Sequence, residues 1–246
     1  SNYENNFRDN LRKIMVKNFA DAIIANSQNG VNFWQSLNYN RNITSIPNII
    51  KPLTKHNHKE KKPIISKYVL FIGRFKKQKN VLYTYDLFKY LAVNNNMKFI
   101  MIGDGPFYDF IKKDIYKSKL DYNIKIYRNK ANVIDFYNKC ELFISLSHHE
   151  GMPNTLIEAV LLNKKIIVSN ISQHTNLLGT NFPNYIDTKD SITENAKKVL
   201  KAYKNKHKQS DYEFIKCKLK NYSPKKISIK YSEHFNFLKN NLYEKN

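Results

Sequence analysis

Short apolar runs alternate with amphipathic stretches along residues 68–200 of the chain. The apolar runs are rich in β-branched and aromatic residues and stop at a glycine or a polar loop, which is typical of buried strands. These predicted strands are residues 68–73, 97–103, 122–128, 141–147, 164–170 and 184–187. Apolar residues recur at helical spacing in the stretches between and after them, at residues 80–92, 106–118, 132–140, 154–163 and 191–205. Ser191 and Glu194 suit a capping box at the start of the last helix.

This alternation predicts an α/β fold with a Rossmann-like open parallel sheet and helices on both faces. In such sheets, ligands bind outside the carboxyl ends of the strands, where the loops gather. The ends of the chain follow a different pattern. Residues 6–27 read as a helix leading into a strand with no earlier strand to pair with, and residues 221–242 read as a helix that begins at Ser-Pro. The prolines and lysines of residues 45–63 are typical of a linker.

We therefore expect a leftover unit and crossover in residues 1–50, a linker in 51–67, the α/β domain in 68–220 and a C-terminal helix in 221–246. This division suggests that the N-terminal half of a two-domain protein is missing from the chain.

Charge adds a preference for anionic partners, because 42 Lys and Arg face 20 Asp and Glu, a formal net charge of +22. Nucleotides, nucleic acid and an acidic membrane leaflet all fit such a surface. AT-rich codon usage is an equal alternative, since Lys, Asn, Ile, Tyr and Phe are all abundant. No RNA-binding motif is present, so no nucleic acid is expected as a partner. No apolar run approaches the roughly 18 residues of a membrane span.

Metal and thiol chemistry are not favoured. Cys140 and Cys217 lack a metal-binding spacing and fit a reducing, cytoplasmic compartment. His148 and His149 stand beside Glu150, and His56 and His58 lie in the expected linker, but no carboxylate or thiol follows at ligand spacing. We expect no metal site.

Loops after three predicted strands bring polar groups to one edge of the sheet. They read "GRFKKQKN" (73–80), "GDGP" (103–106) and "SHHEGMPN" (147–154). Gly73, Gly103 and Gly105 allow tight turns and a close approach of backbone to a ligand. Arg74 and Lys79 place two cations above the sheet, as a diphosphate requires.

The stretch "EGMPNTLIEA" (150–159) places two carboxylates around the start of a helix. They could be a catalytic pair, unrelated surface charges or two clamps on one ligand. Pro153 and Asn154 are good helix-start residues, so the N–H groups around them form an anion site. Glu150 then precedes the helix and Glu158 lies in its second turn. This arrangement favours clamps on the two sides of a ligand whose phosphate sits at the helix tip.

Taken in order, "GRFKKQKN", "IGDGP" and "EGMPNTLIEA" resemble the donor-binding domain of GT-B retaining glycosyltransferases of group 1, the family 4 type. Glu150 and Glu158 meet the Glu-x7-Glu pattern of that family, and the resemblance covers about residues 20 to 240. It implies that residues 1–50 are the end of the acceptor domain with the interdomain crossover. It also implies that residues 221–246 form the helix that packs back on the N-terminal domain.

The resemblance implies a role for each matching residue. Arg74 and Lys79 would bind the donor diphosphate and stabilise the leaving group, Glu150 would contact the transferred sugar, and Glu158 would accept hydrogen bonds from the ribose. The remaining donor-binding residues are Gly73, Gly103, Gly105, Gly151, Asn154, Thr155 and Leu156. The donor would be a UDP- or GDP-sugar, with no cofactor and no metal.

The expected function is hexosyl transfer to a glycan or lipid-linked acceptor in bacterial polysaccharide biosynthesis, in the cytoplasm or peripherally at the inner face of an anionic membrane. Two alternatives stay open: a fragment that binds nucleotide sugar without transfer, and a basic module that binds nucleic acid or a membrane surface. Asn176 stands where many members have an acidic residue, and Arg128 where a glycine is frequent. These departures leave the sugar and the base undefined.

Overall fold

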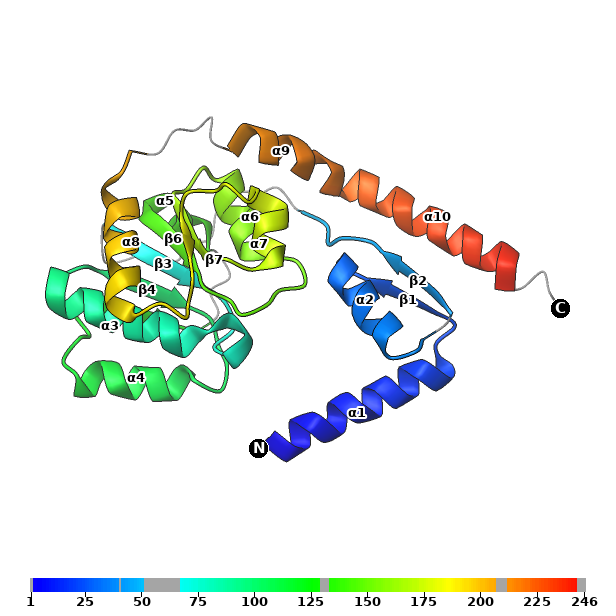
Figure 1. Ribbon diagram of the computed structural model, residues 1–246, viewed down its shortest axis with the longest axis horizontal. Helices are drawn as coiled ribbons and strands as arrows, with labels where there is room; N and C mark the ends of the chain where they lie inside the picture. The colour runs from blue at the N-terminus through cyan, green and yellow to red at the C-terminus, as the bar shows by residue number, and fades with distance from the viewer. Residues whose placement is uncertain (1, 40, 51–66, 129–132, 207–211, 243–246) are drawn as a thin grey trace. The chain divides into compact units, whose positions relative to one another are not determined.

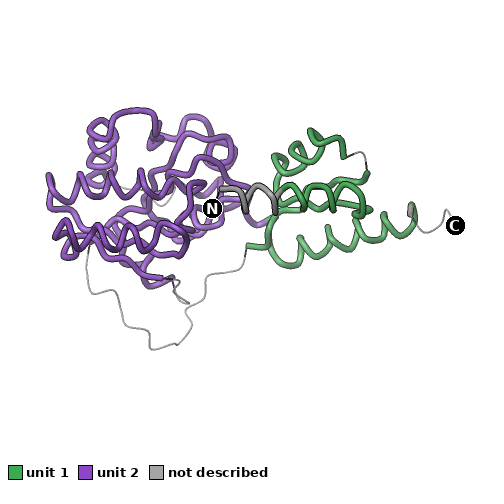
Figure 2. Tube along the Cα trace, turned by 90° about the horizontal axis from the view of Figure 1, so that it is seen from below, with its two compact units in different colours: residues 1–51, 221–246 green, residues 52–220 purple. Residues whose placement is uncertain are grey.

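The computed structural model describes residues 2–39, 41–50, 67–128, 133–206 and 212–242. The chain forms two compact units, which are residues 1–51 with 221–246 and residues 52–220 (Figure 2). The larger unit contains every residue predicted to bind the donor. The predicted linker at 51–67 lies outside the described residues except for Lys67.

The larger unit is built on a six-stranded sheet in which all neighbouring strands are parallel (Figure 1). Its order is β5-β4-β3-β6-β7-β8. The strands are β3 (Tyr68–Ile72), β4 (Phe99–Ile102), β5 (Ile124–Tyr127), β6 (Cys140–Ser145), β7 (Ile166–Ser169) and β8 (Tyr185–Ile186). Helices lie on both faces, so the predicted fold class is confirmed.

Helices follow the strands in sequence; five of them were predicted from the periodicity, whereas α7 and α9 were not. They are α3 (Val81–Asn95), α4 (Tyr108–Lys117), α5 (Ile134–Lys139), α6 (Asn154–Leu161), α7 (Ser172–Leu178), α8 (Ile192–Lys204) and α9 (Glu213–Leu219). A single 3-10 turn, η1 (Lys77–Lys79), precedes α3. Ser191 and Glu194 form the predicted capping box, because the Ser191 Oγ accepts from the Glu194 N–H and the Glu194 carboxylate accepts from the Ser191 N–H.

Apolar residues pack on both faces of the sheet because its central strands are buried on both sides. On one face, Val69 and Phe71 of β3 pack with apolar residues of α3, α4 and α8, and Phe88 of α3 stacks on Phe99 of β4 at 4.2 Å between ring centroids. On the other face, Tyr68 is buried and its hydroxyl donates to the Phe136 carbonyl at 2.8 Å. Such double-sided burial explains why the strands read as unbroken apolar runs.

The strand order fixes where loops gather. From β3 the chain crosses to β4 on one side, whereas from β6 it crosses to β7 on the other, so β3 and β6 flank a topological switch point. The loops after neighbouring strands β4, β3 and β6 therefore meet at one edge of the sheet, where ligands bind in open α/β folds.

The smaller unit contains α1 (Asn2–Phe19), β1 (Ala22–Ala25), α2 (Gln28–Ser36), β2 (Asn42–Ser45) and α10 (Pro224–Leu242), which follows the 3-10 turn η3 (Lys220–Tyr222). The strand expected to have no earlier partner, β1, pairs in parallel with the later strand β2, in the register Ala22 to Asn42. The Ile50 N–H donates to the Tyr222 carbonyl at 2.9 Å. None of the helices among the described residues is long and apolar enough to cross a membrane.

Candidate functional site

The first two loops are locked together through their backbones. Gly103 and Gly105 have φ angles of +152° and +150°, which side chains rarely adopt. A Cβ added at Gly103 would lie 1.9 Å from the Gly73 carbonyl oxygen, and one at Gly105 would lie 2.7 Å from the Phe75 oxygen. The Phe75 N–H donates to the Asp104 carbonyl at 2.8 Å. Glycine is therefore required here by a close approach of two chains as well as by backbone conformation.

A cavity of about 230 Å³ opens between these loops. It is lined by Ile72, Gly73, Arg74, Ile102, Gly103, Asp104 and Val133. Arg74 is exposed at this cavity, so its guanidinium is accessible to a ligand. This pocket is the hollow that the described residues provide beside the predicted phosphate-binding loops.

Arg128, which stands where a glycine is frequent in the family, forms ion pairs beside this cavity. Its guanidinium lies 2.6 Å from the Asp104 carboxylate and 3.0 Å from that of Asp109, over the ring of Tyr108. The Gly105 N–H and then Arg128 lower the pKa of Asp104, which keeps this carboxylate ionised. Arg128 therefore fixes the second loop by charge.

Lys79 and Glu150, predicted to meet the same donor, contact each other directly. The Lys79 Nζ lies 2.5 Å from the Glu150 Oε1, and the two side chains are only 16% and 4% exposed. The Ser147 Oγ donates to the same oxygen at 2.6 Å. Both hydrogen bonds are made to Oε1, so Oε2 is the carboxylate oxygen that these two contacts do not use. The loop after β3 and the loop after β6 are thus joined by a buried ion pair.

Buried polar residues lie behind this pair. The Ser169 Oγ donates to the Ser147 carbonyl at 2.6 Å, and the His174 Nδ1 donates to the Ser169 carbonyl at 2.9 Å. Burial lowers the pKa of His174, and the Nδ1 hydrogen bond assigns the neutral tautomer with its proton on that nitrogen. Within the described part of the chain, His174 Nε2 is buried without a partner. These residues support the loop that presents Glu150.

Sequence reasoning missed Ser147, Ser169 and His174 as members of the site. Their common signal is position: the two serines stand at or just after the carboxyl ends of β6 and β7, where an otherwise apolar run turns polar. His174 lies in α7, a helix that the sequence pattern did not predict. All three are buried, which separates them from the exposed neighbours His148 and His149.

Helix α6 begins where Pro153 and Asn154 predicted it. The Asn154 N–H donates to the Met152 carbonyl at 2.9 Å, so this amide is engaged within the loop. The N–H groups of Thr155 and Leu156 belong to the first turn, where a helix supplies no acceptor of its own. The helix tip therefore favours negative charge at these two amides. Gly151 is exposed in the loop that leads to them.

Glu158 lies in the second turn of α6 and is half-buried. The hydroxyl of Tyr137, in α5, lies 3.0 Å from its Oε2 and 2.9 Å from the Thr155 carbonyl oxygen. Burial raises the pKa of Glu158, and the Tyr137 hydrogen bond partly offsets that rise. The structure therefore joins Glu150 to Lys79 and Glu158 to Tyr137, and the two glutamates have separate partners.

No three His, Cys, Asp or Glu side chains gather in a metal-binding cluster in residues 2–39, 41–50, 67–128, 133–206 and 212–242. The expected linker histidines, His56 and His58, lie outside those ranges. Cys140 is buried and Cys217 is exposed, and both are free thiols.

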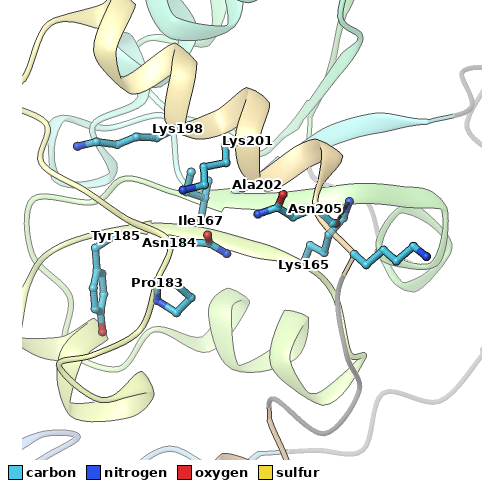
Figure 3. A pocket seen from close by; sticks show the side chains of 10 residues that line it. Lys165, Ile167, Pro183, Asn184, Tyr185, Lys198, Lys201, Ala202 and Asn205 are labelled. Carbon is cyan, nitrogen blue, oxygen red and sulfur yellow. Dashed lines mark hydrogen bonds between the residues drawn. The ribbon is translucent and has the colours of Figure 1, made fainter.

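A second cavity, of about 400 Å³, lies between α8 and the edge of the sheet (Figure 3). Its lining includes Lys165, Lys198 and Lys201, but none of the predicted site residues. The Lys165 Nζ donates to the Tyr203 and Asn205 carbonyls, and Lys198 pairs with Asp190. Since Lys165 immediately precedes β7, this cavity lies toward the amino ends of the strands, away from the switch-point loops.

Comparison with known proteins places the chain in a family. Residues 54–216 match the family model described as glycosyl transferases group 1. An uncharacterized glycosyltransferase from Methanocaldococcus jannaschii is 28% identical over 160 residues, which cover 61% of this chain and 39% of that protein. UDP-Gal:alpha-D-GlcNAc-diphosphoundecaprenol alpha-1,3-galactosyltransferase from Escherichia coli is 30% identical over 122 residues, covering 47% and 31%.

The fold is also similar to a solved structure of the Staphylococcus aureus protein TarM, in complex with Fondaparinux, alpha-GlcNAc-glycerol and UDP. The TM-score is 0.70 at 22% identity, and the match covers 91% of this chain and 45% of that one. The chain spans less than half the length of these relatives. Because the family model matches well over half of its residues, the chain belongs to the glycosyl transferases group 1 family.

Proposed function

We propose that this chain is the nucleotide-sugar-binding half of a retaining glycosyltransferase of the family 4 type, with a GT-B architecture. The single observation that supports this most is the buried Lys79–Glu150 pair at the switch point, beside the α6 tip. That arrangement places a cation for phosphate, a carboxylate for a sugar and free helix amides within one loop cluster.

The donor diphosphate binds against the glycine loops, with Arg74 and Lys79 as its cationic partners. As the bond between the anomeric carbon and the phosphate oxygen breaks, negative charge grows on the leaving nucleoside diphosphate. Cations and helix-tip amides that are already in place stabilise that charge in the transition state. The amides of Thr155 and Leu156 contribute from the first turn of α6. No metal or cofactor is required by this arrangement.

The two glutamates bind opposite ends of the donor. Glu150 offers Oε2 to a hydroxyl of the transferred sugar, because Lys79 and Ser147 already occupy Oε1. Glu158 accepts from the ribose hydroxyls of a UDP- or GDP-sugar. With its Oε1 paired in this way, Glu150 acts as a sugar contact, and the Glu-x7-Glu spacing reads as two clamps.

The acceptor is a glycan or a lipid-linked sugar, and the setting is polysaccharide biosynthesis in a bacterial cytoplasm, with peripheral contact to the anionic inner face of the membrane. Support comes from the Escherichia coli relative, whose name specifies hexosyl transfer to a diphosphoundecaprenol-linked sugar. The net charge of +22 favours contact with an anionic membrane surface. Since the chain spans 39% and 31% of the two relatives named above, binding of nucleotide sugar without transfer is the second candidate for the chain by itself.

Calorimetric titration with UDP, GDP and their sugars tests the proposal. We expect binding of one of the two nucleotides, and a loss of at least about tenfold in affinity in Lys79→Met, since a charge-assisted hydrogen bond contributes ~1.5–3 kcal/mol. Lys201→Met, which removes an exposed lysine of α8, is the charge-matched control and should bind as the unmodified chain does. Absence of binding at millimolar nucleotide refutes both candidates. Equal losses of affinity in the two variants would mean that the nucleotide binds through the overall positive charge of the chain and not at Lys79.

A further inference from the structure

Tyr137 makes contacts that packing alone does not require. It belongs to α5, its side chain is 0% exposed, and its ring packs against Phe143 at 5.5 Å between centroids. A phenylalanine would make the same ring contact. The hydroxyl, by contrast, is costly to bury unless it is hydrogen-bonded.

The partners of that hydroxyl both belong to the start of α6. The Thr155 carbonyl oxygen lies at 2.9 Å and the Glu158 Oε2 at 3.0 Å, although Tyr137 is 18 and 21 residues away in sequence. The single phenolic proton is shared between two acceptors. It therefore links the carboxylate to the backbone of the turn whose amides face the proposed phosphate.

A glutamate side chain loses rotamer entropy when it is fixed in one conformation. The Tyr137 hydroxyl, which donates a hydrogen bond to Oε2, restricts the Glu158 rotamers before any ligand binds and leaves Oε1 as the acceptor. Preorganisation of this kind increases affinity because less freedom is lost on binding.

We propose that Tyr137 is a positioning residue for ribose recognition, which holds Glu158 through Oε2 so that Oε1 receives the ribose hydroxyls. This inference rests on the proposed function, in which Glu158 binds the ribose of the donor. Tyr137 itself contacts neither the ribose nor the reacting atoms.

The test compares Tyr137→Phe with a matched control, Tyr68→Phe. Tyr68 is also 0% exposed, and its hydroxyl donates to the carbonyl of Phe136, the residue next to Tyr137. Each substitution removes one buried phenol hydroxyl from the same neighbourhood and keeps the ring. Only Tyr137→Phe removes a contact to Glu158.

The readout is the affinity for a nucleoside diphosphate and for its 2′,3′-dideoxy counterpart, measured by calorimetry with whichever of UDP or GDP binds. Tyr137→Phe should weaken binding of the ribose form about tenfold, because the rotamer freedom of Glu158 must then be lost on binding, and should change binding of the dideoxy form less than about twofold. Tyr68→Phe should leave both affinities within about twofold. In a Glu158→Ala background, Tyr137→Phe should have no further effect on the ribose preference.

Replacement of Tyr137 by p-aminophenylalanine retains a donor and should restore the ribose preference. If Tyr137→Phe does not fold, 4-fluorophenylalanine fills the volume of the hydroxyl without donating, and the same preference is measured. Equal weakening of the ribose and dideoxy forms, or no difference from Tyr68→Phe, would overturn the positioning role while leaving the proposed function intact. Absence of nucleotide binding by the unmodified chain would refute the proposed function and this inference with it.

Discussion

Substitution of Lys79 by Met should destabilise the larger unit, because it leaves a carboxylate buried without its cation. The Glu150 side chain is 4% exposed and keeps only the Ser147 hydroxyl as a partner once the ammonium is removed. Methionine has a length similar to that of lysine, so the packing around the stem is largely retained. The change therefore isolates the charge.

The magnitude follows from the geometry of the pair. Unit charges 2.5 Å apart attract by roughly 6–7 kcal/mol at an effective dielectric constant of about 20. Most of that attraction offsets the desolvation of the two groups, and removal of one partner of a buried pair costs about 3–5 kcal/mol. Because Lys79 is 16% exposed and Ser147 still donates to Glu150, we expect the lower end, about 3 kcal/mol. For a unit of this size that corresponds to a melting temperature lower by about 6–12 °C.

Thermal and urea unfolding of four proteins measure this effect: the unmodified chain, Lys79→Met, Glu150→Gln, and the double variant. The double variant should be more stable than Lys79→Met alone by at least ~1 kcal/mol, since it no longer buries an unpaired charge. Lys201→Met should change the free energy of unfolding by less than about 0.5 kcal/mol. The reasoning fails if Lys79→Met unfolds like Lys201→Met, or if the double variant is the least stable of the four.

Three further outcomes are expected. Gly103→Ala should lower the free energy of unfolding in urea by more than ~3 kcal/mol, because its Cβ would clash with the Gly73 carbonyl. Gly179→Ala, at φ +86° with nothing within 4 Å of the added Cβ, should lower it only by the backbone strain of ~1–2 kcal/mol. Equal losses in the two variants would contradict the close contact of the loops at Gly103. Glu158→Gln should weaken binding of bare nucleotide, whereas Glu150→Gln should mainly reduce the preference for sugar nucleotide over bare nucleotide in calorimetry, and the reverse pattern would exchange their roles. Burial raises the pKa of Glu158 above its ordinary 4.5, so its contribution to folding stability is complete below that value and is lost as pH rises through the raised pKa. Under the proposed function, Glu158 accepts from ribose as a carboxylate, which forms in that same pH range, so nucleotide affinity should increase with pH there. After correction for the titration of the nucleotide phosphate, Glu158→Gln should show no such increase.

The sheet was predictable because its local signals agree with the fold. Strands buried on both faces must be apolar throughout, and helices between parallel strands must present an apolar face, so the two periodicities could be read directly. The structure shortens most predicted elements by one or two residues at each end, as at β4, predicted over 97–103 and observed over Phe99–Ile102. In the smaller unit, α2 and β2 were missed because "QNGVNFWQS" and "NITS" are too polar and too short to show a period.

The meeting of the loops was predictable, but the side-chain pairings within them were not. Because parallel strands end at the same edge of the sheet, the sequence predicted that the loops of Lys79 and Glu150 meet, although these residues are 71 positions apart. Their ion pair depends on how η1 and the loop after β6 pack, which periodicity does not encode. Tyr137 falls within the predicted helix at 132–140, but nothing in the sequence shows where the hydroxyl of a buried tyrosine points. The hydrogen bond between Tyr137 and Glu158 therefore became visible only in the structure.

The Lys79–Glu150 pair has a consequence for how an anion enters this site. An incoming phosphate meets an ammonium that already has a counter-anion built into the protein, so its arrival is an exchange of one anion for another. The affinity of the site for phosphate is then a difference between two attractions, and a donor whose sugar reaches Glu150 as its diphosphate reaches Lys79 compensates both members of the pair at once. A free diphosphate or pyrophosphate ion compensates only one of them. Under the proposed function, the site selects for complete donors by penalising an anion that arrives without its sugar.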